Sequence, residues 1–306
     1  MKFPPQGEGI GVLEWPLFSR GLGLEDAVWD NGIGRPTRGK PMTIERRPWP
    51  VRPARRAGPR RVGLLVWITP LIFALPGLAA GGTVRDADRF AAERKAMVET
   101  QVVARGVRNP AVLAAMQTVP RHLFVPPEIR DEAYADYPLP IGEGQTISQP
   151  YIVAFMTESL GLKKKDKVLE VGTGSGYQAA VLSLLAGAVL TIEINPRLSR
   201  QAAETLASLG YSNVRVRSGD GFFGWPEEAP FDAIIVTCAV DRIPPRLFEQ
   251  LAEGGRLILP LGDSGDFQML TLVTKKGGRP VVRDLMYVRF VPMTGEALKK
   301  KEGLSL

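Results

Sequence analysis

The sequence is poor in two residue types that often carry metal or nucleophilic chemistry. Among its 306 residues there is one cysteine, Cys238, and one histidine, His122. An internal disulfide needs two cysteines and a Cys/His zinc site needs several ligands, so the sequence excludes both. A Ser-His-Asp or Cys-His mechanism would depend on His122 alone. We therefore expect chemistry that needs neither a metal nor an imidazole base.

The chain beyond residue 80 also lacks an excess of charge of either sign. The whole sequence has a net charge of +7 and a pI near 9.6. Residues 1–80 hold 12 Lys and Arg against 6 Asp and Glu, whereas residues 81–306 hold 27 against 26. Nucleic-acid binding depends on a concentrated positive surface, and the later region has no such excess. We therefore expect no nucleic-acid partner.

The N-terminal region shows no helical or alternating apolar period. Residues 1–60 are rich in Gly, Pro and Arg, as in "RPWPVRPARRAGPRR", which is typical of disorder. Within 61–82, the apolar run "VGLLVWITPLIFALPGLAA" at 62–80 follows two arginines, as in a secretory signal or a short membrane anchor. A third interpretation is a later translation start, at Met42 or beyond. We expect a folded domain at 83–306.

In the first part of that domain the sequence predicts helices and a long loop. A helix is expected from Asp86, as its N-cap, to Gly106, and a second helix with Asn109 as its cap. The segment 119–149 is rich in prolines and glycines, and a loop of this length inside a domain is often functional. A further helix is expected at 150–161.

Strands and helices then alternate. Apolar strands are expected at 167–171, 188–194, 213–218, 231–238 and 255–262, helices at 177–186, 196–210 and 245–252, and a closing strand pair around Gly277 and Gly278. Near-continuous apolar strands separated by helices indicate a parallel sheet covered on both faces. We predict an α/β fold, doubly wound and Rossmann-like, with a mostly parallel sheet and an N-terminal helical and loop extension.

The turn after the first of these strands lacks the third glycine of a dinucleotide-binding fingerprint. In "EVGTGSGY", Gly172, Gly174 and Gly176 alternate, and Tyr177 stands where G-x-G-x-x-G has its last glycine. Acidic-x-G-x-G-x-G is instead the pattern of S-adenosylmethionine (SAM) methyltransferases. Glu193 ends the next strand about 20 residues further on, the usual place for a carboxylate that binds ribose. The sequence predicts a SAM site, with a plain strand–helix connection as the alternative.

A second glycine-flanked acid follows the third strand, in Gly219-Asp220-Gly221. Ligands of open α/β sheets bind beyond the carboxyl ends of the strands, where Asp220 can reach an adenine amino group. The alternative is an ordinary turn, because Asp and Gly are favoured turn residues.

Six segments spread over about residues 95–295 share the motifs of one enzyme family. They are "RGVRNPAVLAAMQTVPRHLFVP", "AYADYPLPIGEGQTISQPYIVA", "VLEVGTGSGYQAAVLS", "GDGFFGWPEEAPFDAIIVTCAV", "GGRLILPLG" and "VPMTG". These segments resemble the protein-L-isoaspartate O-methyltransferases, a family to which "GQTISQPYIVA" is specific. The resemblance implies a methyltransferase domain that transfers the SAM methyl to the free carboxylate of L-isoaspartyl (or D-aspartyl) residues in damaged proteins, which initiates repair.

The resemblance also implies roles for matching residues. Ser148 falls at the position of the family's active-site serine. The positions that match cofactor contacts are Thr146, Ile147, Gly172, Gly174, Ser175, Glu193, Asp220, Gly221 and Thr294. Some relatives have a histidine where this chain has Tyr151. An alternative for Ser148 is the N-cap of the helix that starts near Pro150.

The implied reaction suits a chain with little imidazole or thiol. A carboxylate has a pKa of roughly 4, so it is ionised at neutral pH and can attack a methyl group without a general base. The hydroxyl of Ser148, with backbone N–H groups, can orient that carboxylate and leave one oxygen free to react.

Partners and location follow from the same resemblance. We expect isoaspartyl-containing proteins as substrates, SAM as methyl donor, no metal, and a monomer. A cytoplasmic location matches the supply of SAM, with export or anchoring through 62–80 as the alternative. Two other functions stay open: a SAM methyltransferase acting on RNA or a small molecule, and a membrane-tethered binding protein without turnover.

Overall fold

A computed structural model of the chain describes residues 84–262 and 267–298. Within these ranges, seven strands form one sheet in the order β5-β4-β3-β6-β7-β8-β9. They are β3 (Lys167–Val171), β4 (Ala188–Glu193), β5 (Val214–Ser218), β6 (Phe231–Val236), β7 (Leu251–Leu261), β8 (Gln268–Lys276) and β9 (Arg279–Val288). The segments expected at 1–60 and 61–82 lie outside the described residues.

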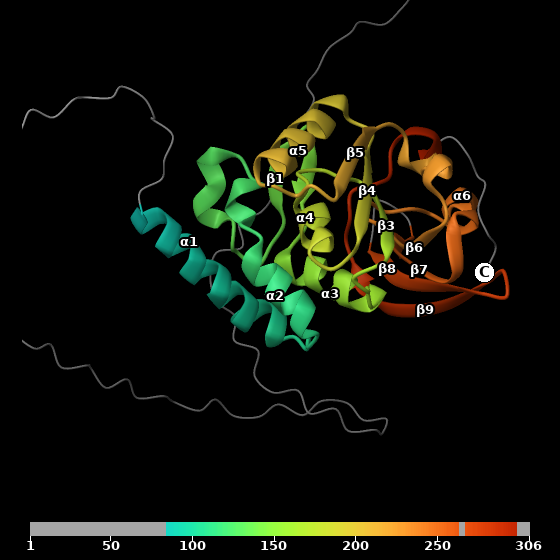
Figure 1. The fold of residues 1–306 in the computed structure, drawn as a ribbon, viewed down its shortest axis with the longest axis horizontal. Helices are drawn as coiled ribbons and strands as arrows, with labels where there is room; N and C mark the ends of the chain where they lie inside the picture. Colours follow the sequence, from blue (N-terminus) through green and yellow to red (C-terminus); the bar gives the residue numbers. More distant parts are fainter. Residues whose placement is uncertain (1–83, 263–266, 299–306) are drawn as a thin grey trace, which may run out of the picture. The chain divides into compact units, whose positions relative to one another are not determined.

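The sheet is mostly parallel, as predicted. Strands β5, β4, β3, β6 and β7 run parallel, and β8 and β9 form an antiparallel hairpin at one edge (Figure 1). The central strands β3 and β6 are buried along nearly their whole length. Burial on both faces explains why "KVLEV" and "FDAIIV" are nearly continuous apolar runs rather than alternating ones. The α/β, doubly wound class is confirmed.

Helices cover both faces of the sheet. The apolar cluster on one face includes side chains of α3 (Pro150–Leu160), α4 (Tyr177–Ser183) and α5 (Pro196–Ser208), whereas α6 (Pro245–Glu249) contributes to the cluster on the other face (Figure 1). In α5 the buried residues Leu198, Ala202 and Leu206 recur every four positions, so one stripe of the helix faces the sheet.

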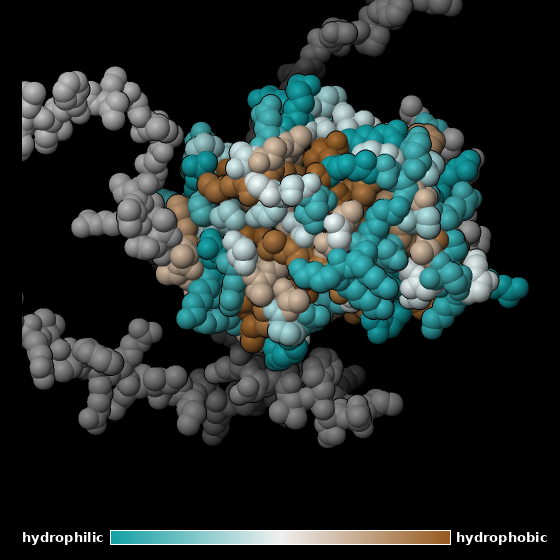
Figure 2. All heavy atoms as spheres, viewed as in Figure 1, coloured by the Kyte–Doolittle hydropathy of each residue, from teal (hydrophilic) through white to brown (hydrophobic). Residues whose placement is uncertain are grey.

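The N-terminal extension packs beside α3 and α4. Its elements are α1 (Val84–Met97), the π-helix η1 (Val98–Val103), α2 (Pro110–Thr118), the 3-10 helices η2 (Arg121–Leu123) and η3 (Pro127–Glu132), and a hairpin of β1 (Leu139–Gly142) and β2 (Gln145–Ile147). On the side of the molecule seen in Figure 2, apolar patches lie in the middle of the described region and hydrophilic surface surrounds them. No described helix is long and apolar enough to cross a membrane.

Helix ends follow the sequence signals in most places. Asn109 caps α2 and Asn195 caps α5, each accepting hydrogen bonds from the two backbone N–H groups that follow the proline at N1. Gly161 ends α3 in the left-handed region, with φ of 54°. The cap expected at Asp86 is wrong, because α1 already begins at Val84.

The order of the strands reverses between β3 and β6. The chain moves outward from β3 to β4 and β5, then returns to β6 on the other side of β3. Crossover connections leave in opposite directions at such a switch point, so a crevice opens beyond the carboxyl ends of the two central strands. The fold therefore places the glycine turn after β3 at the edge of a ready-made ligand site.

Candidate functional site

A cleft of about 290 Å³ opens at this switch point. It gathers the tip of the β1–β2 hairpin, the glycine turn, the ends of β4 and β6, and the segment 291–294. Among its lining residues are seven that the sequence singled out: Thr146, Gly172, Gly174, Glu193, Asp220, Gly221 and Thr294. Residues more than 140 positions apart in sequence therefore meet at one site.

Three of the predicted site residues do not line this cleft. Ile147 is buried in the apolar core. Ser175 lines a second cleft, of about 350 Å³, between α5 and the segment around Phe124. Gly174 lines both clefts, so the two meet at the glycine turn. Ser148, the third, follows β2 immediately and is half-buried.

The glycine turn is shaped by close backbone approach. Gly172 has a φ of 98°, and a Cβ there would lie 2.4 Å from Thr237 Oγ1. The Thr237 hydroxyl donates to the Gly172 carbonyl at 2.7 Å. Gly176 has a φ of 88° and packs on Leu206 of α5. The turn therefore needs glycine for its own packing.

Thr237 is a site residue that sequence reasoning missed. It follows β6 at the switch point and lines the cleft beside Cys238. Residues directly after a central strand of a doubly wound sheet lie at the ligand edge, but this strand was expected to run to residue 238, which placed Thr237 inside it.

Glu193 is tied to the glycine turn. Its side chain is 5% exposed, and Oε2 accepts a hydrogen bond from the Gly174 N–H at 2.8 Å. Oε1 accepts from the Asn195 N–H at 3.0 Å. Each carboxylate oxygen can accept two bonds, so both keep a lone pair for hydroxyl groups of a ligand.

Asp220 joins the C-terminal segment to the cleft. Oδ1 accepts from the Phe222 N–H at 2.9 Å, which caps the 3-10 helix η4 (Gly221–Phe223), as the turn interpretation expects. Oδ2 accepts from the Glu296 N–H at 2.7 Å. A Cβ on Gly295 would lie 2.4 Å from that Oδ2, so only glycine allows this approach. Gly295 was also missed, and its contact holds the adjacent Thr294 at the cleft.

The cleft is acidic. Glu143, Glu193 and Asp220 line it, and none of its lining residues in the described ranges is Lys or Arg. Burial, together with Glu193 and Asp220, raises the pKa of the Cys238 thiol to about 12, so the thiol stays neutral at neutral pH. Within those ranges no group of three or more His, Cys, Asp or Glu could hold a metal ion. An acidic cleft of this kind suits a cationic organic ligand and disfavours a pyrophosphate.

The acidic residue of the glycine motif does not line the cleft. Glu170 is fully buried in β3 and pairs in register with Thr191 of β4. Burial raises its pKa to about 8, which favours the neutral acid at neutral pH.

The β1–β2 hairpin is fastened to the start of α5. Glu143, at the hairpin tip, has a φ of 52°, which is uncommon for a residue other than glycine. Its carboxylate accepts from Arg197 Nη1 at 3.0 Å and from Asn195 Nδ2 at 3.2 Å. The same Asn195 donates its N–H to Glu193, so the hairpin tip and the Glu193 carboxylate are linked.

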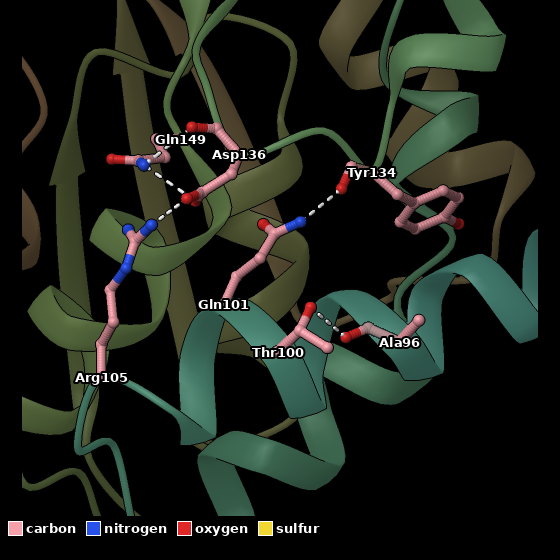
Figure 3. A network of polar contacts seen from close by, with 7 residues as sticks. All are labelled: Ala96, Thr100, Gln101, Arg105, Tyr134, Asp136 and Gln149. Carbon is pink, nitrogen blue, oxygen red and sulfur yellow. Dashed lines mark hydrogen bonds and ion pairs between the residues drawn. The ribbon is translucent and has the colours of Figure 1, made fainter. Parts of the chain in front are cut away.

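The loop after β2 is held through its backbone and through Gln149. Arg121 Nη2 donates to the Ser148 carbonyl at 2.8 Å. Gln149 Nε2 donates to the Asp136 carbonyl and side chain, and Asp136 also pairs with Arg105 (Figure 3). The N-cap interpretation of Ser148 is wrong, because Gln149 holds the N-cap position of α3 and no side chain caps this helix.

Tyr151 lies outside the cleft lining. Its ring is half-buried, 5.7 Å from the Phe155 ring, and the Arg105 guanidinium lies 5.0 Å from its centroid. This arrangement gives Tyr151 a packing role.

His122 also lies outside the cleft lining. Its ring stacks on Phe90 at 4.1 Å, and Nδ1 lies 2.8 Å from the Tyr134 hydroxyl. Arg94 donates to the same hydroxyl at 3.0 Å, so Tyr134 can donate to Nδ1 of a neutral ring. Burial, with Arg94 and Arg130 nearby, lowers the pKa of His122 to about 4. The histidine is a packing residue of the extension.

This low pKa predicts a specific pH dependence. Between about pH 6.5, the ordinary pKa, and pH 4, the unfolded chain binds a proton at His122 that the folded chain does not, so folding stability falls as the pH falls. We expect the Tm advantage of the parent over His122→Asn to shrink as the pH is lowered from about 6.5 to 4. Because the chain has a single histidine, NMR titration of its imidazole gives the folded pKa directly. A pKa near 6.5, or a constant Tm difference, would contradict the assignment.

A mostly parallel doubly wound sheet with an alternating-glycine turn and an acidic cleft at its switch point defines a Rossmann-like methyltransferase. The model of the protein-L-isoaspartate(D-aspartate) O-methyltransferase family matches residues 92–298. The chain belongs to this family.

Individual relatives agree. The chain is 55% identical over 236 residues to protein-L-isoaspartate O-methyltransferase 2 of Shewanella sediminis, covering 77% of this chain and 96% of the relative. It is 58% identical over 204 residues to the Opitutus terrae enzyme, covering 67% and 88%.

Two solved structures show the same fold. A protein-L-isoaspartate O-methyltransferase superposes with a TM-score of 0.61 at 31% identity, covering 68% of this chain and 67% of that one. A β-aspartate methyltransferase from Plasmodium falciparum, solved in complex with S-adenosyl-L-homocysteine, gives 0.59 at 27% identity, covering 66% and 98%.

Proposed function

We propose that this protein methylates the free α-carboxylate of L-isoaspartyl residues in aged proteins, with SAM as the methyl donor. The resulting ester closes to a succinimide without the enzyme, and hydrolysis returns some normal aspartate. Family membership over residues 92–298 supports the reaction, and the acidic cleft at the switch point supports the donor.

The assignment of SAM as the methyl donor depends on the charge of the cleft. A sulfonium is cationic, so an acidic cleft without lining Lys or Arg in the described ranges favours it over a phosphate-bearing cofactor. Glu193 retains acceptor capacity on both oxygens for ribose hydroxyls, and Asp220 does the same for an adenine amino group. We assign Thr146, Ile147, Gly172, Gly174, Ser175, Gly221 and Thr294 to the surroundings of the same ligand.

In the proposed reaction the side chains only need to position the substrate carboxylate against the methyl donor. When bound, SAM supplies an electrophilic methyl group to an anionic oxygen. The substrate carboxylate is already ionised at neutral pH, so no general base is needed. Ser148 orients that carboxylate by a hydrogen bond and leaves one oxygen free. Placement of this kind contributes on the order of 7–11 kcal/mol at best.

Domain limits, partners and location complete the proposal. We assign catalysis to a methyltransferase domain at 83–306, acting as a monomer. The near-zero net charge of 81–306 favours a protein substrate over nucleic acid. The cytosolic supply of SAM favours a cytoplasmic site of action, and fractionation of cells that carry a C-terminal tag distinguishes this from export or anchoring.

The decisive experiment compares two peptides. The purified full chain, given labelled SAM, should methylate an isoaspartyl peptide and leave its aspartyl twin almost unlabelled. The aspartyl peptide is the matched control because it differs only in which carboxylate is free. Equal labelling of both peptides, or labelling of RNA alone, would refute the proposed substrate.

A further inference from the structure

Arg121 is a buried cation that connects segments on either side of the candidate active site. Its side chain is 0% exposed. Nε donates to the Ala133 carbonyl at 2.7 Å, and Nη2 donates to the Ser148 carbonyl at 2.8 Å. Both acceptors lie in irregular chain, where a backbone carbonyl has no strand or helix partner to hold it. The guanidinium supplies that partner to both at once.

The same guanidinium lies over an aromatic ring of the glycine-turn helix. Its central carbon is 4.8 Å from the centroid of the Tyr177 ring. Tyr177 is the first residue of α4 and follows Gly176 directly. Arg121 therefore contacts, through one rigid planar group, both the loop that carries Ser148 and the helix that begins at the cofactor turn.

Burial of the Arg121 guanidinium carries a desolvation cost. No ion pair with a carboxylate occurs for it within the described ranges, and its Nη1 has no hydrogen-bond partner there. Burial lowers its pKa to about 10, which still leaves the guanidinium charged at neutral pH. If this cation only filled space, the folded protein would be less stable than with an apolar side chain of similar volume at the same position. The hydrogen bonds of Arg121 to two backbone carbonyls point to a positional requirement that an apolar side chain cannot meet.

A second set of contacts holds the same loop but does not reach the cofactor turn. Gln149 donates to Asp136, Asp136 pairs with Arg105, and Gln101 of η1 donates to the Tyr134 carbonyl (Figure 3). These contacts fix the loop to the segment 133–136. Arg121 adds the connection from that loop and segment to α4.

We propose that Arg121 is a positioning residue that sets the distance between Ser148 and the glycine turn. It acts through the carbonyl of Ser148, which leaves the hydroxyl available to the substrate. Because the cation lies behind the loop backbone, it does not pair with the substrate carboxylate in place of the serine. This inference rests on the proposed function, since the two ends of the connection are the assigned carboxylate and methyl-donor sites.

The test uses Arg121→Met and Arg121→Lys in the full chain. Met removes charge and donors at similar volume, whereas Lys keeps the charge but cannot span both carbonyls with a planar fork. We expect Met to lower kcat for an isoaspartyl peptide about 10- to 50-fold, with Kd for SAM changed less than about 3-fold. Lys should recover part of that kcat.

The matched control is Arg256→Met. Arg256 also donates to a backbone carbonyl, that of Gly161 at 2.9 Å, and pairs with Asp166, but these contacts lie before the start of β3, away from the cleft. It should lower Tm and leave kcat within about 2-fold of the parent. Parent-like kcat in both Arg121 variants would overturn the positioning role.

A double-mutant cycle with Ser148→Ala separates positioning from general destabilisation. If Arg121 acts through Ser148, Arg121→Met should lower kcat less than about 2-fold in the Ser148→Ala background. Fully multiplicative losses would overturn the proposal. If the Met variant does not fold, the folded Lys variant and its cycle give the same decision. A parent enzyme without activity on isoaspartyl peptide would refute the proposed function instead.

Discussion

Replacing Ser148 with alanine is expected to lower kcat for an isoaspartyl peptide by about 10²- to 10³-fold, the cost of removing one preorganised donor from a reacting centre. The hydroxyl is the group assigned to orient the carboxylate. Its loop is held by Arg121 at the Ser148 carbonyl and by Gln149, so the backbone should stay in place in the variant. Ser148 does not line the acidic cleft to which SAM binding is assigned, so Kd for SAM should change less than about 2-fold. Steady-state kinetics and calorimetry measure the two quantities.

Ser159→Ala is the matched control for this variant. Ser159 lies in α3, is half-buried, and donates to the Phe155 carbonyl at 2.7 Å. The control therefore removes the same hydroxyl oxygen from a serine outside the loop that carries Ser148. It should leave kcat near that of the parent. Ser148→Ala with parent-like turnover would remove the serine from the mechanism.

Replacing Glu193 with alanine is expected to raise Kd for SAM by at least about 100-fold. Two hydrogen bonds from ribose hydroxyls to a nearly buried carboxylate would be lost, each about 1.5–3 kcal/mol. The Gly174 and Asn195 N–H groups would also lose their acceptor, so the glycine turn and the start of α5 would be less well held. Calorimetric titration measures the affinity, and the Tm of the ligand-free protein reports the loss of internal contacts.

Glu204→Ala is the corresponding control. Glu204 is an exposed carboxylate on α5 that lines the second cleft and not the first. Its removal should leave Kd for SAM within about 2-fold. If Glu193→Ala lowers Tm but binds SAM as the parent does, Glu193 supports the turn and does not contact the ribose.

Several parts of the site were predictable because they depend on local pattern and strand order. A parallel sheet brings the carboxyl ends of its strands to one edge, so residues that follow β3, β4 and β5 meet there whatever separates them in sequence. For this reason Gly172, Glu193 and Asp220 could be placed near one another before any coordinates. The cap at Asn109 was predictable because it also depends only on local sequence: one side chain and the first turn of the helix that follows.

Other parts depend on contacts between distant segments. The Thr237 hydroxyl lies against the backbone of Gly172, and the Asp220 carboxylate lies against the backbone of Gly295. A Cβ on either glycine would be 2.4 Å from the oxygen that it faces. The N-cap position of α3 falls on Gln149 rather than Ser148, a difference of one residue that sequence signals do not resolve.

By itself the sequence determined the chemistry available: one histidine, one cysteine, an alternating-glycine turn and a carboxylate at the end of the next strand. Only the tertiary structure decided that His122 is a packing residue, that the cleft is acidic, and that Arg121 lies between the serine loop and Tyr177. The physical reason is the separation along the chain over which each effect acts. Residue type and spacing act along the chain, whereas burial, charge balance and the length of a contact depend on which distant segments fold together.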